Sequence, residues 1–443
     1  MRHTPRLLPF LIAFIIVVLA SAQPEKPQPA FQPEEFQPSS PGEKALLQQI
    51  ADLLGGILPA GPVKAPDQLR LEALKRYLDE YPSGKFHIPA AALTAKALVK
   101  LERVPDLIVF AKERLAKEPT GAQAEAAVML LREHARVTKD PAAAIAVLDE
   151  LGKSKTPAVA WYGTMGGAQV LHLSGKGKAA QERLEKFPEK DLTPQMQNER
   201  DFGLANLIKE QADEASGDEK AKLEERLVGL LDKVIAACEK DPAGNAEMSA
   251  AFIVKAHVAL AHADPKGARE AYQKVAKLYP GTNEAQEAEM IGPQVELIGQ
   301  KAPDFEGPGL DGKPVSSKAL AGKIAIVDFW ATTCPPCVAE APNVSKVTHD
   351  FAKRPFAIVS ISLDAPGRED TIKEFLKKTE IDWPQVYEGK GWKSELAAKF
   401  HVTAIPSMFM LDENGVVKRI GLRGEELRSA LDVELARVEK AKK

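Results

Sequence analysis

Hydrophobic residues follow two different patterns along the chain, and the two patterns meet near residue 296. From about residue 44 to 296 they recur at helical spacing, most regularly in residues 223–240, LEERLVGLLDKVIAACEK. In that segment the apolar side chains recur three or four residues apart and would share one face of a helix. Cys238 lies on this face among leucines, so we expect a buried thiol without a chemical role. The pattern predicts an all-helical domain over residues 44–296.

Prolines follow several of the predicted helices and indicate where these helices end. A proline just past a helix prevents its continuation, and such prolines stand at Pro82, Pro119, Pro188 and Pro280. In the last unit, Ala268, Tyr272, Val275 and Pro280 are spaced as in the second helix of a tetratricopeptide (TPR) repeat. We therefore expect stacked helical hairpins, a TPR-like repeat domain that binds a partner protein which the sequence does not name. A compact all-helical domain without a repeat is the alternative.

After residue 296 the pattern changes to short runs of β-branched and other apolar residues. The runs IAIVDF (324–329), FAIVSIS (356–362) and SMFMLD (407–412) each have the composition of a buried strand, and helical stretches lie between them. Residues 412–415, DENG, predict a hairpin turn into a last strand. Strands that alternate with helices favour an α/β domain. The predicted fold class is therefore multidomain, with an N-terminal all-α domain and a C-terminal α/β domain over residues 297–443.

The first 43 residues predict export followed by a linker. A basic start, MRHTPR, precedes an apolar run over residues 7–20, and small residues follow up to Ala22, as in a cleavable signal peptide. The apolar run is shorter than the roughly 20 residues that span a bilayer, and an uncleaved anchor is the alternative. We expect a signal peptide over residues 1–22, a proline-rich linker over residues 23–43, and a mature protein in the periplasm or cell envelope.

Composition limits the classes of partner. The 443 residues are enough for two or three domains. Lys and Arg number 59 against 62 Asp and Glu, which gives a formal net charge of −3. Proteins that bind the phosphate backbone need a clustered basic excess, so we expect no nucleic-acid partner.

The candidate chemistry lies at a pair of close cysteines. The chain has three cysteines, and two of them, Cys334 and Cys337, lie between the predicted strand 324–329 and a predicted helix. Cys334 would stand at the N-terminus of this helix, where free N–H groups and the helix dipole stabilise a thiolate. A thiolate attacks a disulfide sulfur, and Cys337 could then resolve the mixed disulfide. The spacing predicts a redox-active dithiol.

Other uses of a cysteine pair have less support in the neighbouring residues. Haem attachment needs a His directly after the second cysteine, where Val338 stands. A structural zinc site needs four ligands, and no second cysteine pair exists, so we expect no metal and no cofactor. A static disulfide would close a small loop and stabilise little. A peroxidase of the peroxiredoxin kind would have Thr where this chain has Ala331.

Residues 300–440 resemble the thioredoxin-fold domain of the TlpA/ResA-like group of exported thiol–disulfide oxidoreductases. The resemblance rests on APDFEGPGLDGKPVSSKALAGKIAIVDFWATTCPPC and VTAIPSMFMLDENG, and residues 367–389 leave room for the helix and strand that this group inserts. It implies that Cys334 is the nucleophile and Cys337 the resolving thiol. It also implies that Pro406 is a cis-proline facing both cysteines.

The same resemblance implies roles for three residues beside the cysteines. Trp330 would pack against the site, Glu340 matches the acidic residue that tunes the pair in ResA-like proteins, and Asp328 matches the buried carboxylate of thioredoxin. A desolvated carboxylate has a raised pKa and can exchange a proton with the resolving thiol. A solvated helix glutamate is the alternative for Glu340. Pro335 and Pro336 remove two N–H donors from the helix start, which predicts a weakly stabilised thiolate and a reducing couple.

The predicted function is the reduction of disulfides in exported proteins, with apocytochromes c among the expected clients. This reaction requires re-reduction by a membrane electron donor, and the helical domain would bind a further protein partner. One alternative is a helical interaction or scaffold protein in which the thioredoxin unit only docks. The other is a thiol peroxidase.

Overall fold

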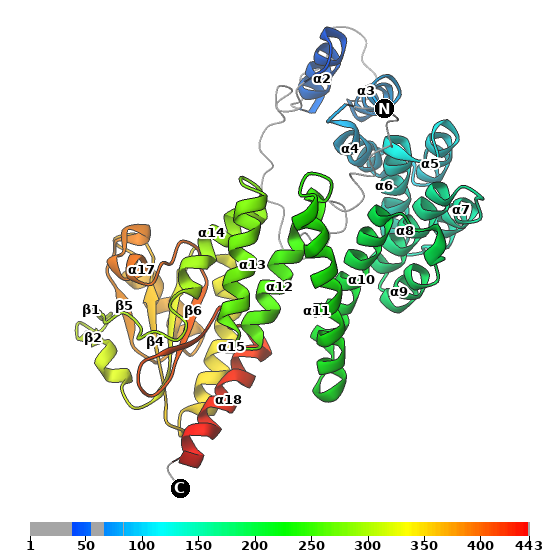
Figure 1. Cartoon of the computed structure of the whole chain (residues 1–443). Helices are drawn as coiled ribbons and strands as arrows, with labels where there is room; N and C mark the ends of the chain where they lie inside the picture. Colours follow the sequence, from blue (N-terminus) through cyan, green and yellow to red (C-terminus); the bar gives the residue numbers. More distant parts are fainter. Residues whose placement is uncertain (1–37, 55–65, 83, 442–443) are drawn as a thin grey trace. The chain divides into compact units, whose positions relative to one another are not determined.

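The computed structural model describes residues 38–54, 66–82 and 84–441 (Figure 1). These residues form two compact units that divide between Ala251 and Phe252. The expected signal peptide lies outside the described residues, as does the expected linker up to residue 37. The last three linker residues belong to the first described helix, Pro41–Leu54. Within the described ranges, no helix is both long and apolar enough to cross a membrane.

The first unit is helical throughout its described residues (Figure 1). Its α-helices are α2 (Pro41–Leu54), α3 (Pro66–Glu80), α4 (His87–Lys100), α5 (Pro105–Lys117), α6 (Gly121–Thr138), α7 (Ala142–Gly152), α8 (Pro157–Leu173), α9 (Gly177–Glu185), α10 (Pro194–Glu214) and α11 (Gly217–Lys240), with short 3₁₀ helices at Glu189–Asp191 and Ala246–Met248. Consecutive helices pack in pairs, such as α3 with α4 and α10 with α11. In addition, α4 contacts α6, α6 contacts α8, and α8 contacts α10. The all-α prediction is confirmed, and the assignment to a TPR-like repeat stays a prediction.

The apolar stripe predicted within residues 223–240 is the buried face of α11. Its buried side chains are Leu227, Leu230, Leu231, Val234, Ile235 and Cys238. The Cys238 thiol is fully buried, and its sulfur lies 3.7 Å from the carbonyl oxygen of Asn245. This packing leaves the thiol without access to solvent.

The second unit joins α12, α13 and α14, which precede the strands, to a domain built on a five-stranded sheet. Its helices are α12 (Ala250–Ala261), α13 (Pro265–Leu278), α14 (Asn283–Val295), α15 (Pro335–Phe351), α16 (Glu369–Lys378), α17 (Glu395–Lys399) and α18 (Gly424–Ala441), with 3₁₀ helices at Ser317–Leu320 and Gly391–Lys393. Its strands are β1 (Glu306–Pro308), β2 (Pro314–Ser316), β3 (Ile324–Trp330), β4 (Phe356–Ser362), β5 (Gln385–Tyr387), β6 (Ser407–Leu411) and β7 (Val417–Ile420). The predicted α/β fold class is confirmed. The predicted boundary at 296/297 marks where helices give way to strands, whereas the compact units divide at the start of α12, between Ala251 and Phe252.

The sheet has the strand order β5-β4-β3-β6-β7, so β3 lies at its centre. β3 runs parallel to β4 and antiparallel to β6, and β6 turns into β7 at residues 412–415 as predicted. β1 and β2 form a separate antiparallel hairpin. The inserted helix and strand implied by the resemblance are α16 and β5.

Both faces of the sheet are covered, which explains why β3 is apolar along most of its length. Ile324 and Ile326 of β3 point to the face that packs on α15 and α18. Phe329 points to the other face, where its ring contacts Phe400 and Phe409. Every residue of β3 is buried. Because β3 is fixed by packing on both faces, it also fixes the start of the loop that follows Trp330.

Helix α14 is attached to the strand that follows Pro406. The side chain of Gln294 donates to the carbonyl of His401 at 3.2 Å and accepts from the hydroxyl of Ser407 at 2.9 Å. The helices that precede the sheet thus help to fix the strand beside the cysteines.

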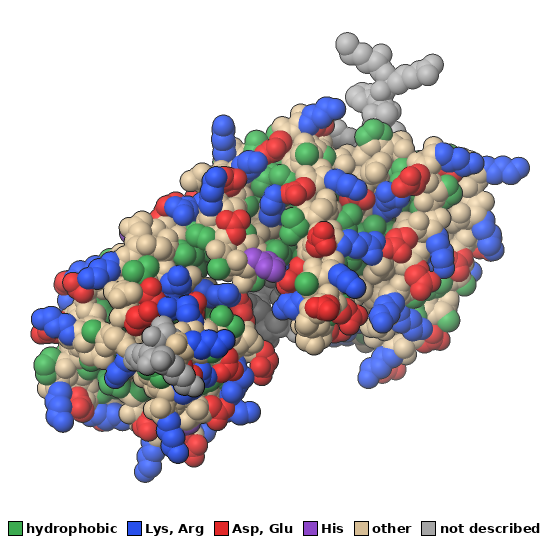
Figure 2. Space-filling model, turned by 60° about the horizontal axis from the view of Figure 1, so that its bottom comes forward, with side chains coloured by type: hydrophobic (Ala, Val, Ile, Leu, Met, Phe, Trp, Pro, Cys, Tyr) green, Lys and Arg blue, Asp and Glu red, His purple; other side chains and the backbone are tan. Residues whose placement is uncertain are grey.

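On the face shown in Figure 2, acidic and basic side chains are interspersed, in agreement with the small net charge.

Candidate active site

Cys334 is the residue directly before α15, and Cys337 lies in the first turn of that helix. Cys334 has an extended backbone, with φ −98° and ψ 103°, as a helix-capping residue requires. The two sulfurs form a disulfide with the Cα atoms 5.3 Å apart. Cys334 is 9% exposed and Cys337 4% exposed. Cys334 is therefore the more accessible of the two.

A single helical N–H group is directed at the sulfur of Cys334 within the described residues. The N–H of Cys337 donates to Cys334 Sγ at 3.2 Å. Pro335 and Pro336 have no N–H group to offer, and the N–H of Val338 donates to the carbonyl of Cys334 instead, at 3.0 Å. The two prolines thus leave one helical N–H at this sulfur, and the weakly stabilised thiolate expected from them stays a prediction.

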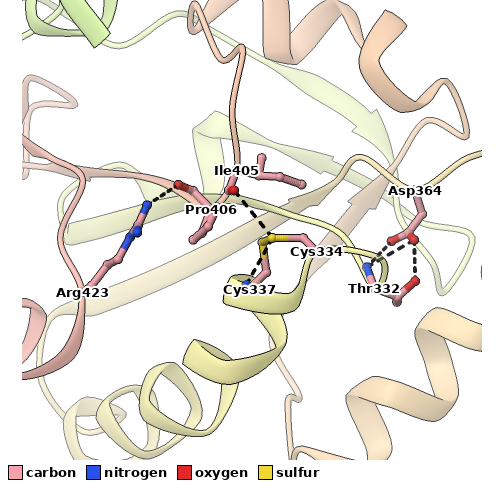
Figure 3. Close-up of a disulfide and its surroundings, with 7 residues drawn as sticks. All are labelled: Thr332, Cys334, Cys337, Asp364, Ile405, Pro406 and Arg423. Carbon is pink, nitrogen blue, oxygen red and sulfur yellow. Dashed lines mark hydrogen bonds between the residues drawn. A yellow bond between two sulfur atoms is a disulfide. The ribbon is translucent and has the colours of Figure 1, made fainter. Parts of the chain in front are cut away.

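Pro406 lies against the disulfide, and the Ile405–Pro406 peptide bond is cis. The carbonyl oxygen of Ile405 lies 3.6 Å from Cys334 Sγ (Figure 3). On the far side of this loop, Arg423 Nη2 donates to the carbonyl of Pro406 at 2.9 Å (Figure 3). The structure thus brings together the cysteines and the cis-proline that the resemblance implies.

Asp328 is buried in the centre of β3. The hydroxyl of Ser360 on β4 donates to its Oδ2 at 3.0 Å. Burial disfavours the charged form and raises the pKa of Asp328 to about 7. The Ser360 hydrogen bond and the charge of Arg423 act to lower this pKa, and the charge of Glu340 adds to the rise.

A small cavity connects the carboxylates with the inner cysteine. It has a volume of about 30 Å³, which is room for one or two water molecules. Its polar lining is provided by Asp328, Cys337, Glu340, Ser360, Gln385 and Arg423. A proton could pass between Asp328 and Cys337 through water held in this cavity.

Glu340 lines the same cavity and also binds the start of α18. Its Oε1 accepts from the N–H of Gly424 at 2.8 Å and from the side chain of Asn343 at 2.7 Å. Glu340 is therefore partly buried and hydrogen-bonded rather than free in solvent. Its implied role in tuning the cysteine pair stays a prediction.

Trp330 ends β3 and packs in the same apolar cluster as both cysteines. Its indole N–H donates to Gln385 Oε1 at 3.1 Å, and its ring lies 5.2 Å from that of Phe375. The indole is 5% exposed. These contacts hold the tryptophan beside the site, as expected.

Sequence reasoning missed two polar residues around the site, Asp364 and Arg423. Asp364 binds Thr332 in the cysteine loop, and Arg423 binds Pro406 (Figure 3). One feature of the sequence could have indicated Asp364. It follows a predicted strand that is parallel to β3, and parallel strands end at the same edge of a sheet. No comparable pattern marks Arg423, which lies in a loop before α18.

The part of the chain that contains this site is similar to known proteins. The family model described as "AhpC/TSA family" matches residues 298–420. The protein named "Thiol-disulfide oxidoreductase ResA" from Bacillus cereus is 32% identical over 142 residues, which are 32% of this chain and 78% of that relative. The "Thioredoxin-like protein YneN" from Bacillus subtilis is 30% identical over 140 residues, 31% of this chain and 79% of the relative.

Among solved structures, a thiol:disulfide interchange protein of the thioredoxin family from Chlorobium tepidum is 33% identical to this chain. The match covers 30% of this chain and 95% of that protein, with a TM-score of 0.28.

Proposed function

The chain belongs to the ResA-like family of thiol–disulfide oxidoreductases, and we propose that it reduces disulfides of exported proteins through Cys334 and Cys337. The observation that carries this proposal is the position of Cys334 Sγ. It lies at a helix N-terminus, accepts the N–H of Cys337 at 3.2 Å and adjoins cis-Pro406. An attacking thiolate needs stabilisation of this kind, access to a client and a second thiol close behind it.

The reaction proceeds in two exchange steps. The thiolate of Cys334 attacks one sulfur of the client disulfide, which forms a mixed disulfide and releases the other client sulfur as a thiolate. The thiolate of Cys337 then attacks Cys334 Sγ, which forms the enzyme disulfide and releases the second client sulfur. Two electrons pass from the enzyme dithiol to the client, and a dithiol donor must return them.

Asp328 accepts the proton that Cys337 loses before the second step. Cys337 is buried, so its thiol cannot lose a proton directly to bulk solvent. The cavity of about 30 Å³ that both residues line has room for a bridging water molecule. A carboxylate with a pKa of about 7 can accept and release a proton near neutral pH.

The surroundings of Cys334 favour a reducing couple. Its thiolate receives one helical N–H donor, and the Ile405 carbonyl oxygen presents a partial negative charge to the same sulfur. Weak stabilisation of the thiolate raises the pKa of Cys334 and makes the dithiol a stronger reductant. A Cys334 pKa near the roughly 3.5 of strong oxidants would contradict this direction.

The basic and apolar start of the chain supports export, which places the reaction in the periplasm or cell envelope. There the clients are oxidised cysteines of exported proteins, with apocytochromes c among them, and the electrons come from a membrane donor. The helical unit supplies the surface that binds a further protein partner.

Trapping tests the proposal directly. Cys337→Ala removes the resolving thiol, so clients should accumulate as disulfides with Cys334 and can be identified by mass spectrometry. The matched control Cys334→Ala keeps the inner thiol and should trap nothing. If the Cys337→Ala variant holds no client in the cell envelope, or if both variants trap the same proteins, the proposal is wrong.

A further inference from the structure

Thr332 and Asp364 lie side by side because of the strand register. β3 and β4 are parallel, with Trp330 opposite Ser362, and the N–H of Leu363 donates to the carbonyl of Trp330 at 2.8 Å. Two residues beyond the end of each strand, the chain reaches Thr332 and Asp364. Thr332 belongs to the three-residue loop that connects β3 to Cys334. A contact between these two residues therefore acts on the loop that carries the cysteine.

Asp364 is 2% exposed and binds this loop with both carboxylate oxygens. Its Oδ1 accepts from the Thr332 hydroxyl at 2.5 Å, and its Oδ2 accepts from the Thr332 N–H at 3.0 Å (Figure 3). The Ser362 hydroxyl also donates to Oδ2, at 2.9 Å. A buried carboxylate is costly unless donors surround it, and two of these three donors belong to Thr332.

Arg368 reaches the carboxylate through the same hydroxyl. Its Nη2 donates to Thr332 Oγ1 at 3.4 Å, while this hydroxyl donates onward to Asp364. The Thr332 N–H thus donates to Asp364, and the Thr332 hydroxyl both donates to Asp364 and accepts from Arg368. Hydrogen bonds to an ionised carboxylate are shorter and stronger than those between neutral groups. The loop has little freedom to move while these bonds persist.

We propose that Asp364 is a positioning residue for Cys334, an inference that rests on the function proposed above. Between Thr332 and Cys334 there is one residue, and the N–H of Cys334 donates back to the carbonyl of Ala331 at 3.2 Å. Fixing Thr332 therefore fixes the direction from which Cys334 Sγ meets the N–H of Cys337. The anchor keeps this N–H···S contact in place while the sulfur changes between thiolate, mixed disulfide and disulfide.

Positioning and plain electrostatics predict opposite changes when the carboxylate is removed. The negative charge of Asp364, acting alone, would disfavour a nearby thiolate, so its removal would lower the Cys334 pKa. Loss of the anchor would loosen the Cys337 N–H contact and raise the Cys334 pKa. The other charged groups around the site, Asp328, Glu340, Arg368 and Arg423, stay the same in either case. The sign of the change separates the two explanations.

The test compares Asp364→Asn and Thr332→Val with the control Thr332→Ser. Thr332→Val removes the hydroxyl and keeps both the loop N–H and the Asp364 charge, whereas Thr332→Ser keeps every hydrogen bond. Each change is made in the full chain with Cys337→Ala, so that Cys334 is the accessible thiol. The pKa of Cys334 is measured from the pH dependence of its alkylation by iodoacetamide, and thermal unfolding reports the stability of each variant.

We expect Asp364→Asn and Thr332→Val to raise the Cys334 pKa by about one unit, the effect of weakening one hydrogen bond to a charged sulfur. Thr332→Ser should match the parent. An unchanged or lowered pKa in Thr332→Val would overturn the inference, even if Asp364→Asn fails to fold. A purely structural role would lower the unfolding temperature and leave the pKa unchanged. Alkylation needs no client, so this result is independent of the trapping experiment.

Discussion

Asp328→Asn should make the second unit more stable at alkaline pH, and this gain should shrink as the pH falls toward the unfolded pKa of 3.8. The folded state raises the Asp328 pKa from 3.8 to about 7, because burial disfavours the charged carboxylate. Stability from the protonated form is fully present below the unfolded pKa and is lost as the pH rises to the folded pKa. At about 1.4 kcal/mol per pKa unit, a shift from 3.8 to about 7 corresponds to about 4 kcal/mol at pH 8. An asparagine cannot ionise, so the variant escapes this loss.

The assay is urea unfolding of the oxidised full chain at pH 5 and pH 8, followed by tryptophan fluorescence. Trp161 is the one tryptophan of the four that lies in the first unit, so both proteins carry Trp161→Phe to report the second unit. Asp311→Asn, at an exposed turn of the same unit, is the matched control and should show no gain that depends on pH. If the difference between Asp328→Asn and its parent is equal at pH 5 and pH 8, the assignment of a neutral buried Asp328 is wrong.

Three further changes test other contacts. Ser360→Ala removes a hydrogen bond that lowers the Asp328 pKa, so the loss of stability with pH should extend to a higher pH in the same titration. Glu340→Ala removes an acceptor for the Gly424 N–H and should cost about 1 kcal/mol in urea unfolding; Glu340→Gln, which keeps a carbonyl oxygen there, should cost less. Burial raises the pKa of Glu199 from 4.5 to about 7, so the first unit should lose stability as the pH rises from about 4.5 to about 7, and Glu199→Gln should flatten this dependence in circular dichroism.

Local hydrophobic patterns predict β3, β4, β6 and β7 of the second unit well. β3 and β4 are covered on both faces, so their sequences are almost continuously apolar and their limits follow from composition. The attachment of α14 to this unit could not be predicted in the same way. It depends on hydrogen bonds from Gln294 to His401 and Ser407, residues more than a hundred positions away, and an isolated glutamine carries no pattern.

In the candidate site, too, residues in local motifs could be predicted from the sequence, whereas residues that act through distant contacts could not. Cys334 and Pro406 belong to short motifs whose chemistry depends on neighbouring residues, so a sequence is sufficient to find them. Asp364 and Arg423 act through contacts with residues far along the chain. Whether a polar residue after a strand is solvated or binds another loop is decided by strand register, which local composition does not contain.

Two buried carboxylates flank the start of the cysteine loop, and their hydrogen bonds suit them to different tasks. Among the described residues, Asp328 has the single donor Ser360 and lines a cavity that can hold water. Asp364 has three donor groups, and they bind both of its oxygens. A carboxylate with few donors can change its protonation state at little cost, whereas one that binds several donors of a loop holds that loop in place. We therefore expect Asp328 to exchange the proton and Asp364 to position the loop, so Ser360→Ala beside one carboxylate and Thr332→Val beside the other should impair different steps of the same reaction.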